Sequence, residues 1–198
     1  MSPPTHPLRR VCVYCGAGSG QLPAYEHAAH DFGRRLASRG IELVYGGGST
    51  GLMGAVASGA LAGGGRVTGV IPEKLQDLEL GKADLTELRI VPDMHTRKKT
   101  MADLSDAFVA LPGGYGTMEE LFEAVTWTQL GYHRKPIGLL DVEGYFQPLL
   151  AFVQHMVDEG FVRPLHAPLI QFDHRPDVLL DRLAHAELPD LESWIDDV

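Results

Sequence analysis

The sequence predicts an α/β fold in which a doubly wound parallel sheet of about seven strands carries helices on both faces. Short apolar runs alternate with longer segments of helical periodicity, which is the pattern of βαβ units. Glycine-rich turns follow several of the apolar runs, as in Rossmann-like proteins. The length of 198 residues fits one domain, and no linker or repeat divides it.

The expected elements follow from these patterns. We expect strands near residues 10–14, 41–45, 66–71, 88–91, 107–111, 136–140 and 168–172. A helix over 22–39 carries an apolar stripe and ends at Gly40, and a second stripe predicts a helix over 145–159. The polar segment 72–88 is expected to be an exposed loop with a short helix. Residues 1–9 are expected to be a disordered tail and 10–198 a single domain.

Charge and hydropathy exclude several classes of protein. The chain has 17 Lys and Arg against 26 Asp and Glu, a net charge of −9, whereas a nucleic-acid binder needs a basic patch. The longest apolar stretch, Leu52 to Ala62, is too short to cross a membrane. The first ten residues contain no apolar core of a signal peptide. We therefore expect a cytoplasmic protein that binds neither nucleic acid nor membrane.

Neither the cysteines nor the histidines form a recognisable reactive or metal site. Cys12 and Cys15 fall in and just after an apolar strand, where residues three apart point to opposite faces, so we expect buried thiols. His27 and His30 lack a third ligand at metal spacing. We therefore expect no metal and no cofactor.

Glycine is in excess, with 23 residues where average usage predicts roughly 14, and it is clustered in turns. Turns at 15–20, 46–51 and 112–117 each follow a predicted strand. The carboxyl ends of parallel strands meet at one edge of the sheet, so these turns can converge. Bare backbone and the N-termini of the following helices favour an anion, and we expect a phosphate on the Gly46–Gly48 and Gly113–Thr117 turns.

The middle turn also allows a different function. Gly46, Gly48 and Gly51 match the dinucleotide fingerprint, with Glu73 after the next strand, so a nicotinamide-dependent oxidoreductase is one alternative. A nucleotide-binding protein without turnover is another. No P-loop signature occurs in the sequence.

Two helix starts carry the candidate chemical groups. Glu119 and Glu120 follow the third turn, although Thr117 and Glu120 also fit a capping box. Arg97 and Lys98 lie near the start of a helix, where the dipole disfavours cations, and a bound anion would compensate them. An acid, two cations and a phosphate would then be neighbours.

The strings PGGYGTMEE at 112–120, MHTRK at 94–98 and YGGGSTGLMG at 45–54 resemble those of the Lonely Guy family of cytokinin riboside 5′-monophosphate phosphoribohydrolases. The resemblance covers roughly residues 10–165. It implies that Arg97 and Glu120 are the catalytic pair. The residues that it implies hold the nucleotide are Lys98, Gly114, Gly116, Thr117, Glu119 and Thr126. We also expect Gly46, Gly47, Met94, Gly113 and Tyr115 to contact the substrate.

The implied reaction is hydrolysis of the N-ribosidic bond of a purine nucleoside 5′-monophosphate, such as an N6-substituted AMP, to the free base and ribose 5-phosphate. Glu120 would stabilise the oxocarbenium-like centre or activate water, whereas the leaving-group acid stays unidentified. Members are often labelled lysine decarboxylases, but we find no Schiff-base lysine setting for pyridoxal phosphate. The resemblance also implies a homodimer whose partner completes the site, and the helix at 118–131 has apolar residues in several directions.

Overall fold

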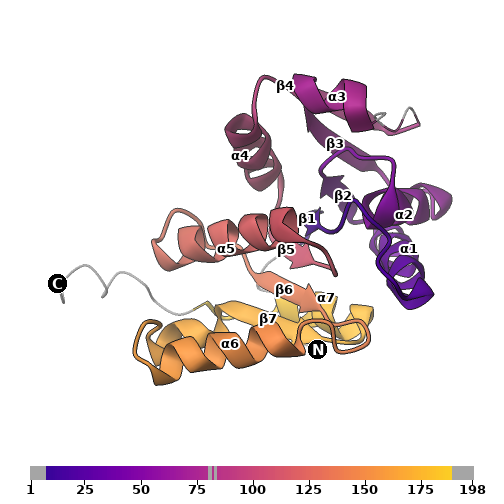
Figure 1. Cartoon of the computed structure of the whole chain (residues 1–198). Coiled ribbons are helices and arrows are strands. Elements are labelled where there is room, and N and C mark those ends of the chain that lie inside the picture. Colours follow the sequence, from indigo (N-terminus) through magenta and orange to yellow (C-terminus); the bar gives the residue numbers. More distant parts are fainter. Residues whose placement is uncertain (1–7, 80–81, 83, 189–198) are drawn as a thin grey trace.

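The computed structural model of the chain describes residues 8–79, 82 and 84–188. In this part of the chain seven parallel strands form one sheet in the order β4-β3-β2-β1-β5-β6-β7 (Figure 1). The strands are β1 Arg10–Tyr14, β2 Glu42–Tyr45, β3 Val67–Pro72, β4 Glu87–Val91, β5 Ala107–Ala110, β6 Ile137–Leu140 and β7 Ile170–Asp173. The predicted parallel sheet is confirmed.

Helices cover both faces of the sheet, as predicted. They are α1 Pro23–Ser38, α2 Gly51–Ala62, α3 Glu73–Glu79, α4 Met94–Leu104, α5 Tyr115–Gln129, α6 Gln147–Asp158 and α7 Pro176–Ala184, with a 3₁₀ helix η1 at Pro164–Leu169. In β1, Val11 and Val13 join the core under α1, α2 and α7, while Cys12 and Tyr14 join the core under α4 and α5. None of the described helices is long and apolar enough to cross a membrane.

The strand order reverses between β1 and β5, which are neighbours in the sheet although residues 15–106 lie between them in the chain (Figure 1). Chains leaving these two strands diverge to opposite sides, and a crevice opens where they separate. Cys12, within β1, and Cys15, directly after it, are both free and buried as expected, and burial raises the pKa of each thiol.

Some boundaries differ from the prediction. The strand expected from residue 168 begins only at Ile170, because a 3₁₀ helix with two prolines precedes it. The short helix expected in the 72–88 segment is present as α3. Of the expected tail, residues 1–7 lie outside the described residues, whereas the Arg9 amide already donates to Asp106 at 2.8 Å. The acidic residues 189–198 also lie outside the described part.

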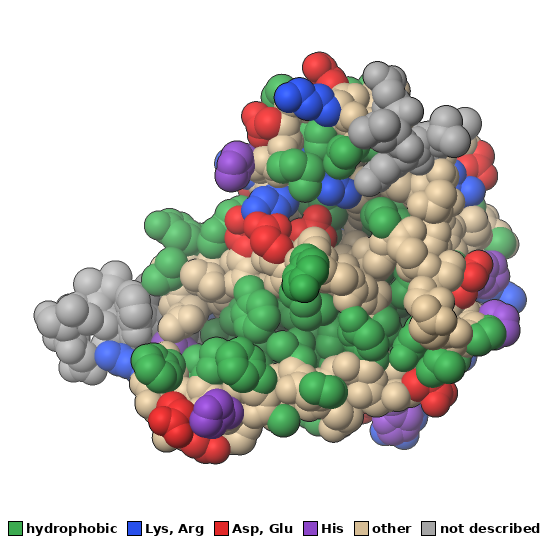
Figure 2. Space-filling model, viewed as in Figure 1, with side chains coloured by type: hydrophobic (Ala, Val, Ile, Leu, Met, Phe, Trp, Pro, Cys, Tyr) green, Lys and Arg blue, Asp and Glu red, His purple; other side chains and the backbone are tan. Residues whose placement is uncertain are grey.

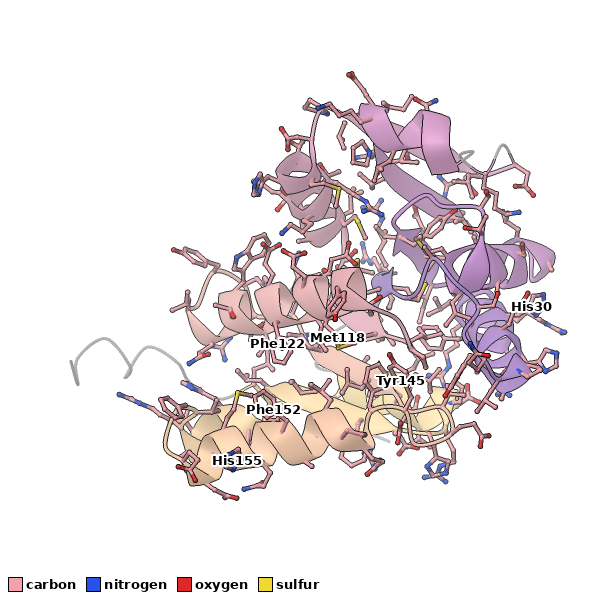
Figure 3. All side chains as sticks on the ribbon, viewed as in Figure 1. His30, Met118, Phe122, Tyr145, Phe152 and His155 are labelled. Atoms are coloured by element: carbon pink, nitrogen blue, oxygen red, sulfur yellow. The ribbon has the colours of Figure 1, made fainter. Side chains whose placement is uncertain are left out.

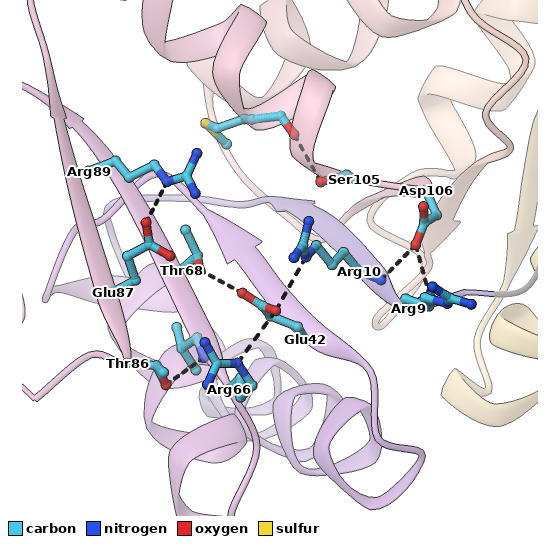
Figure 4. Close-up of polar contacts among 12 residues, drawn as sticks. Arg9, Arg10, Glu42, Arg66, Thr68, Thr86, Glu87, Arg89, Ser105 and Asp106 are labelled. Carbon is cyan, nitrogen blue, oxygen red and sulfur yellow. Dashed lines mark hydrogen bonds and ion pairs between the residues drawn. The ribbon is translucent and has the colours of Figure 1, made fainter.

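Charged side chains at the amino ends of the central strands pair with one another (Figure 4). The Glu42 carboxylate accepts from the Thr68 hydroxyl at 2.6 Å and pairs with Arg10 at 3.3 Å and Arg66 at 3.7 Å. The Asp106 carboxylate accepts from the Arg10 amide at 2.9 Å. The charged groups at this end of the sheet are therefore paired with one another, around a second cavity of about 520 Å³.

Candidate active site

A cavity of about 600 Å³ opens at the carboxyl ends of β1 and β5, at the reversal of strand order. It is lined by Cys15, Gly16, Ala17, Gly18, Ser19, Gly20, Tyr25, Leu52, Met53, Met94, Arg97, Pro112, Gly113, Gly114, Gly116, Thr117, Glu119, Glu120 and Tyr145. Backbone from two glycine turns forms one wall, and a buried cation and carboxylate from two helices form another. Such a crevice is where doubly wound proteins bind ligands.

The first and third glycine turns meet at this cavity. The Gly16 amide donates to the Pro112 carbonyl at 3.0 Å. A Cβ added at Gly16 would lie 3.3 Å from the Gly113 Cα, a distance that leaves no slack for a side chain. The two turns can therefore touch because both positions are glycine.

The middle turn packs against the first turn. A Cβ at Gly51 would lie 2.2 Å from the Ala17 carbonyl oxygen, and Gly51 has a positive φ of 56°. The amides of Leu52 and Met53, which open α2, donate to the Gly16 carbonyl at 3.0 and 3.3 Å. These two amides at the start of α2 are thus hydrogen-bonded within the protein and are not available to a ligand.

The start of α5 is different. Gly114 is the N-cap and has no side chain to cap the helix, and its carbonyl accepts the first helical bond, from Met118, at 3.1 Å. The amides of Tyr115, Gly116 and Thr117 precede that bond and have no carbonyl within the helix. With the helix dipole they form a site suited to a phosphate.

The boundary of α5 also decides the capping-box alternative. That interpretation requires Thr117 to be the N-cap, but the helix begins at Tyr115 and Thr117 is its third residue. The capping-box interpretation is therefore wrong, because Glu120 lies one full turn inside the helix.

Arg97 reaches the cavity from α4, whose N-cap Asp93 accepts from the Thr96 amide at 2.7 Å. Its side chain is only 9% exposed. Nε donates to the Val70 carbonyl at 3.1 Å and Nη2 donates to the Gly46 carbonyl at 2.9 Å. Nη1 lies 3.9 Å from Glu120 Oε1. The guanidinium is thus fixed by two backbone carbonyls beside the carboxylate.

Glu120 is the most perturbed carboxylate of the cavity wall. Burial raises its pKa to about 7, the nearby Arg97 charge opposes that rise in part, and the Glu119 charge adds to it. A carboxyl group with this pKa is present in both protonation states near neutral pH. It can therefore accept and return a proton during a reaction.

Lys98 makes a second link between α4 and α5. Its ammonium group pairs with Glu119 and, at 2.8 Å, with Glu123. Burial lowers the pKa of Lys98, but the hydrogen bonds to Glu119 and Glu123 outweigh it, and the net shift is upward. Lys98 is thus occupied by carboxylates and is not among the residues that line the cavity.

The structure brings most of the predicted site residues together. Those that line the cavity are Met94, Arg97, Gly113, Gly114, Gly116, Thr117, Glu119 and Glu120, and those outside its lining are Gly46, Gly47, Lys98, Tyr115 and Thr126. The Thr126 hydroxyl donates to the Phe122 carbonyl at 2.7 Å. A Cβ at Gly47 would lie 3.1 Å from Ile71, so Gly47 packs against β3. The Tyr115 side chain is 96% exposed.

Two aromatic residues of the cavity were missed by sequence reasoning. Tyr25 lies in the helix predicted over 22–39 and Tyr145 at the start of the helix predicted over 145–159, and neither belongs to a glycine turn or a charged motif. The two rings meet edge to face with centroids 5.8 Å apart, and the Tyr145 hydroxyl donates to the Gly113 carbonyl. Only the three-dimensional approach of α1 to the β6–α6 loop places them together.

The family model that matches residues 53–183 is described as "Possible lysine decarboxylase". Pyridoxal phosphate would need a lysine for its Schiff base, and the described residues that line the cavity include none. The residues present therefore do not fit that cofactor.

Relatives of this chain carry a different name. A rice (Oryza sativa subsp. japonica) protein named cytokinin riboside 5′-monophosphate phosphoribohydrolase LOG is 46% identical to this chain. The match covers 95% of this chain and 85% of the rice protein. An Arabidopsis thaliana protein of the same enzyme name is 53% identical, over 82% of this chain and 76% of its own length.

Among solved structures, the molybdenum cofactor carrier protein of Chlamydomonas reinhardtii has a TM-score of 0.68 at 21% identity, over 94% of this chain and all of that chain. At this identity the likeness shows the fold alone. The sequence relatives, by contrast, match 82% and 95% of this chain at 53% and 46% identity. The chain belongs to the Lonely Guy family of phosphoribohydrolases, the family whose model carries the decarboxylase description.

Proposed function

We propose that this protein hydrolyses the N-ribosidic bond of purine nucleoside 5′-monophosphates, including N6-substituted AMP, and releases the free base and ribose 5-phosphate. The observation that carries the proposal is the buried pair of Glu120 and Arg97, 3.9 Å apart, beside the free amides that open α5. The names of the relatives support the same reaction.

The substrate's phosphate occupies the start of α5, on the amides of Tyr115, Gly116 and Thr117. Glycine at 113, 114 and 116 keeps side chains away from this position, and Thr117 is buried beneath it. Binding energy from the phosphate then holds the ribose against the cavity wall that carries Glu120. A nucleoside without phosphate lacks this anchor.

Glu120 in its ionised form takes the proton of the attacking water as the water oxygen bonds to C1′. The C1′–N bond breaks with its electron pair on the base, and the same carboxyl group can return the proton, since its pKa is about 7. Arg97 stays protonated and cannot act as the acid. Its role is to hold its charge next to the carboxylate and to orient ribose or base.

The structure gives the nicotinamide alternative no support. A dinucleotide fingerprint needs bare glycine backbone open to a pyrophosphate. Here Gly51 faces the Ala17 carbonyl and Gly46 faces the Arg97 guanidinium, so these glycines make room for the protein's own groups.

A homodimer that completes the site is part of the proposal. Figure 2 shows an apolar area over α5 and α6, and Figure 3 shows Met118 and Phe122 of α5 on the side of that helix that faces α6, where Phe152 lies. Helix α6 has an apolar stripe but no buried residue in the single chain. Phe152 is 54% exposed and Phe161 is 85% exposed. A second copy on this area would bury these side chains close to the cavity.

One assay tests the reaction: the protein is incubated with AMP, isopentenyl-AMP and adenosine, and the released bases are separated by chromatography. We expect base from the two monophosphates and far less from adenosine. Equal release from AMP and adenosine would contradict the phosphate anchor. Stoichiometric AMP binding without base release would instead favour a carrier.

A Phe152→Asp variant tests the dimer by sedimentation. We expect a monomer with reduced turnover, while Phe172→Asp, an exposed phenylalanine on the edge strand β7, keeps the wild-type mass. A wild-type protein that sediments as a monomer would contradict the dimer without touching the proposed reaction.

A further inference from the structure

Gly46 lies directly after β2 and next to the guanidinium of Arg97. A Cβ added at Gly46 would fall 2.0 Å from Arg97 Nη2 and 3.1 Å from its Cζ. Real Cβ atoms do not approach other atoms this closely, so any side chain at 46 must displace Arg97. The next nearest atom is Met53 Sδ at 3.2 Å, which belongs to a flexible side chain.

Backbone conformation does not explain the glycine. Gly46 is not among the described residues with positive φ, so an alanine would meet no backbone strain there. The neighbouring Gly47 does have a positive φ, of 79°. Glycine at 46 is therefore required by the space that the arginine fills.

We propose that Gly46 is a positioning residue, whose missing side chain and whose carbonyl together fix Arg97 beside Glu120. This inference rests on the proposed function and goes deeper into the same site. Two of the guanidinium's three nitrogens donate to backbone carbonyls: that of Gly46, directly after β2, and that of Val70, within the neighbouring strand β3. The third nitrogen, Nη1, donates to Met94 Sδ at 3.7 Å and lies 3.9 Å from Glu120 Oε1.

The arrangement sets the separation of the catalytic charges. Because Nε and Nη2 are held by rigid strand backbone, Nη1 stays 3.9 Å from Glu120 and does not close into a direct hydrogen bond. A closer, bidentate ion pair between Arg97 and Glu120 would lower the pKa of the carboxyl group. Glu120 would then stay ionised and could not exchange a proton near neutral pH. Gly46 thus keeps the carboxylate titratable while keeping the cation next to it.

The test is a double-mutant cycle of Gly46→Ala and Arg97→Ala, with thermal unfolding, kcat, KM for AMP and the pH dependence of kcat/KM measured for all four proteins. We expect Gly46→Ala to lower kcat by roughly 10- to 100-fold, the effect of a misplaced group of about 1 Å, and to move the Glu120 limb of the pH profile. It should also lower the Tm. In the Arg97→Ala background the guanidinium is gone and only the flexible end of Met53 has to shift, so Gly46→Ala should change kcat and Tm little.

The control is Gly138→Ala. Gly138 is also a buried strand glycine without positive φ, and a Cβ there would lie 2.9 Å from the Leu179 side chain, away from the cavity. This variant should lose Tm and keep both kcat and the pH profile. If Gly46→Ala does not fold alone, the double variant should fold.

Equal losses of Tm and kcat from Gly46→Ala in both backgrounds would overturn the proposal, as would a double variant that fails to fold. A wild-type protein without hydrolytic activity would contradict the proposed function only, because the Tm cycle still measures the coupling of Gly46 to Arg97.

Discussion

The two ends of the parallel sheet each hold a largely buried carboxylate, but the two carboxylates differ in how many partners they have. At the amino end, the Glu42 side chain is 14% exposed and is held by Arg10, Arg66 and the Thr68 hydroxyl. At the carboxyl end, the Glu120 side chain is 12% exposed and has one cation at 3.9 Å. Burial is nearly equal, so the difference lies in the number of partners. The reactive end of this sheet is therefore distinguished by a carboxylate with few ion-pair and hydrogen-bond partners, and not by burial alone.

The difference has a cause in the backbone. The partner arginines at the amino end are largely exposed and free to turn toward Glu42, with side chains 48% and 66% exposed. Arg97 is buried, and its donors are committed to the carbonyls of Gly46 and Val70. The carboxyl end therefore holds its charges apart by rigid backbone, whereas the amino end lets them pair.

The largest effect expected from this comparison is that of Glu120→Gln on turnover. Gln keeps the size of the side chain and cannot accept a proton, so kcat should fall by roughly 10²–10⁴. The fold should be retained, since Glu120 lies inside α5 and does not cap it. Steady-state base release and circular dichroism check this. Wild-type kcat in this variant would remove Glu120 from the mechanism.

The next effect is on stability as a function of pH. The pKa of Glu120 is about 7 in the folded protein, above the 4.5 of a free glutamate, so the fold disfavours the ionised form. The penalty is absent below about pH 4.5, grows as pH rises, and is complete above about pH 7, at on the order of 3 kcal/mol. Glu120→Gln has no such penalty.

The free energy of unfolding of Glu120→Gln minus that of wild type should therefore increase with pH across this window. Urea unfolding at about pH 5 and about pH 8 measures it. A difference that is constant with pH would show that Glu120 titrates as an exposed carboxyl group.

Sequence reasoning recovered the sheet and much of the cavity because both depend on local signals. Apolar periodicity located the strands, and the glycine turn at 112–117 with the helix after it located the start of α5. The positions of Arg97 and Glu120 came from the motifs and from charges at helix starts. Each of these features depends on a pattern of about ten consecutive residues.

The residues whose surroundings differ from the prediction are those that contact distant segments of the chain. Gly46 was expected to hold a phosphate, but its space is taken by a side chain 51 residues further along the chain. Lys98 was expected to hold the nucleotide, but the helices bring it to Glu119 and Glu123, 21 and 25 residues away. Motif spacing cannot tell a glycine that admits a ligand from one that admits an arginine.

A smaller effect is expected when the link between α4 and α5 is removed. Lys98→Met keeps the apolar stem but leaves Glu119 and Glu123 without their cation, and we expect a loss of about 1–3 kcal/mol in the free energy of unfolding. The Lys98 charge also lowers the pKa of Glu120, so the pH limb of kcat/KM should move to higher pH.

The adjacent lysine provides the control for that variant. Lys99 is 70% exposed and pairs with Asp103 one turn along the same helix at 2.6 Å. Lys99→Met should change stability by less than about 0.5 kcal/mol and leave the pH limb in place. A larger loss from Lys99→Met than from Lys98→Met would contradict the buried link.

The smallest effect should come from the amino end of the sheet. Glu42→Gln keeps an acceptor for the Thr68 hydroxyl and loses ion pairs with two exposed arginines, so we expect a loss of about 1 kcal/mol that shrinks as salt is added. Turnover and its pH dependence should equal those of wild type, because Glu42 lies at the opposite end of β2 from Gly46. Unfolding at two salt concentrations and steady-state kinetics check both points. A tenfold fall in kcat would mean that the charges at the two ends are coupled through β2, and the reactive end could then no longer be explained by its own missing partners.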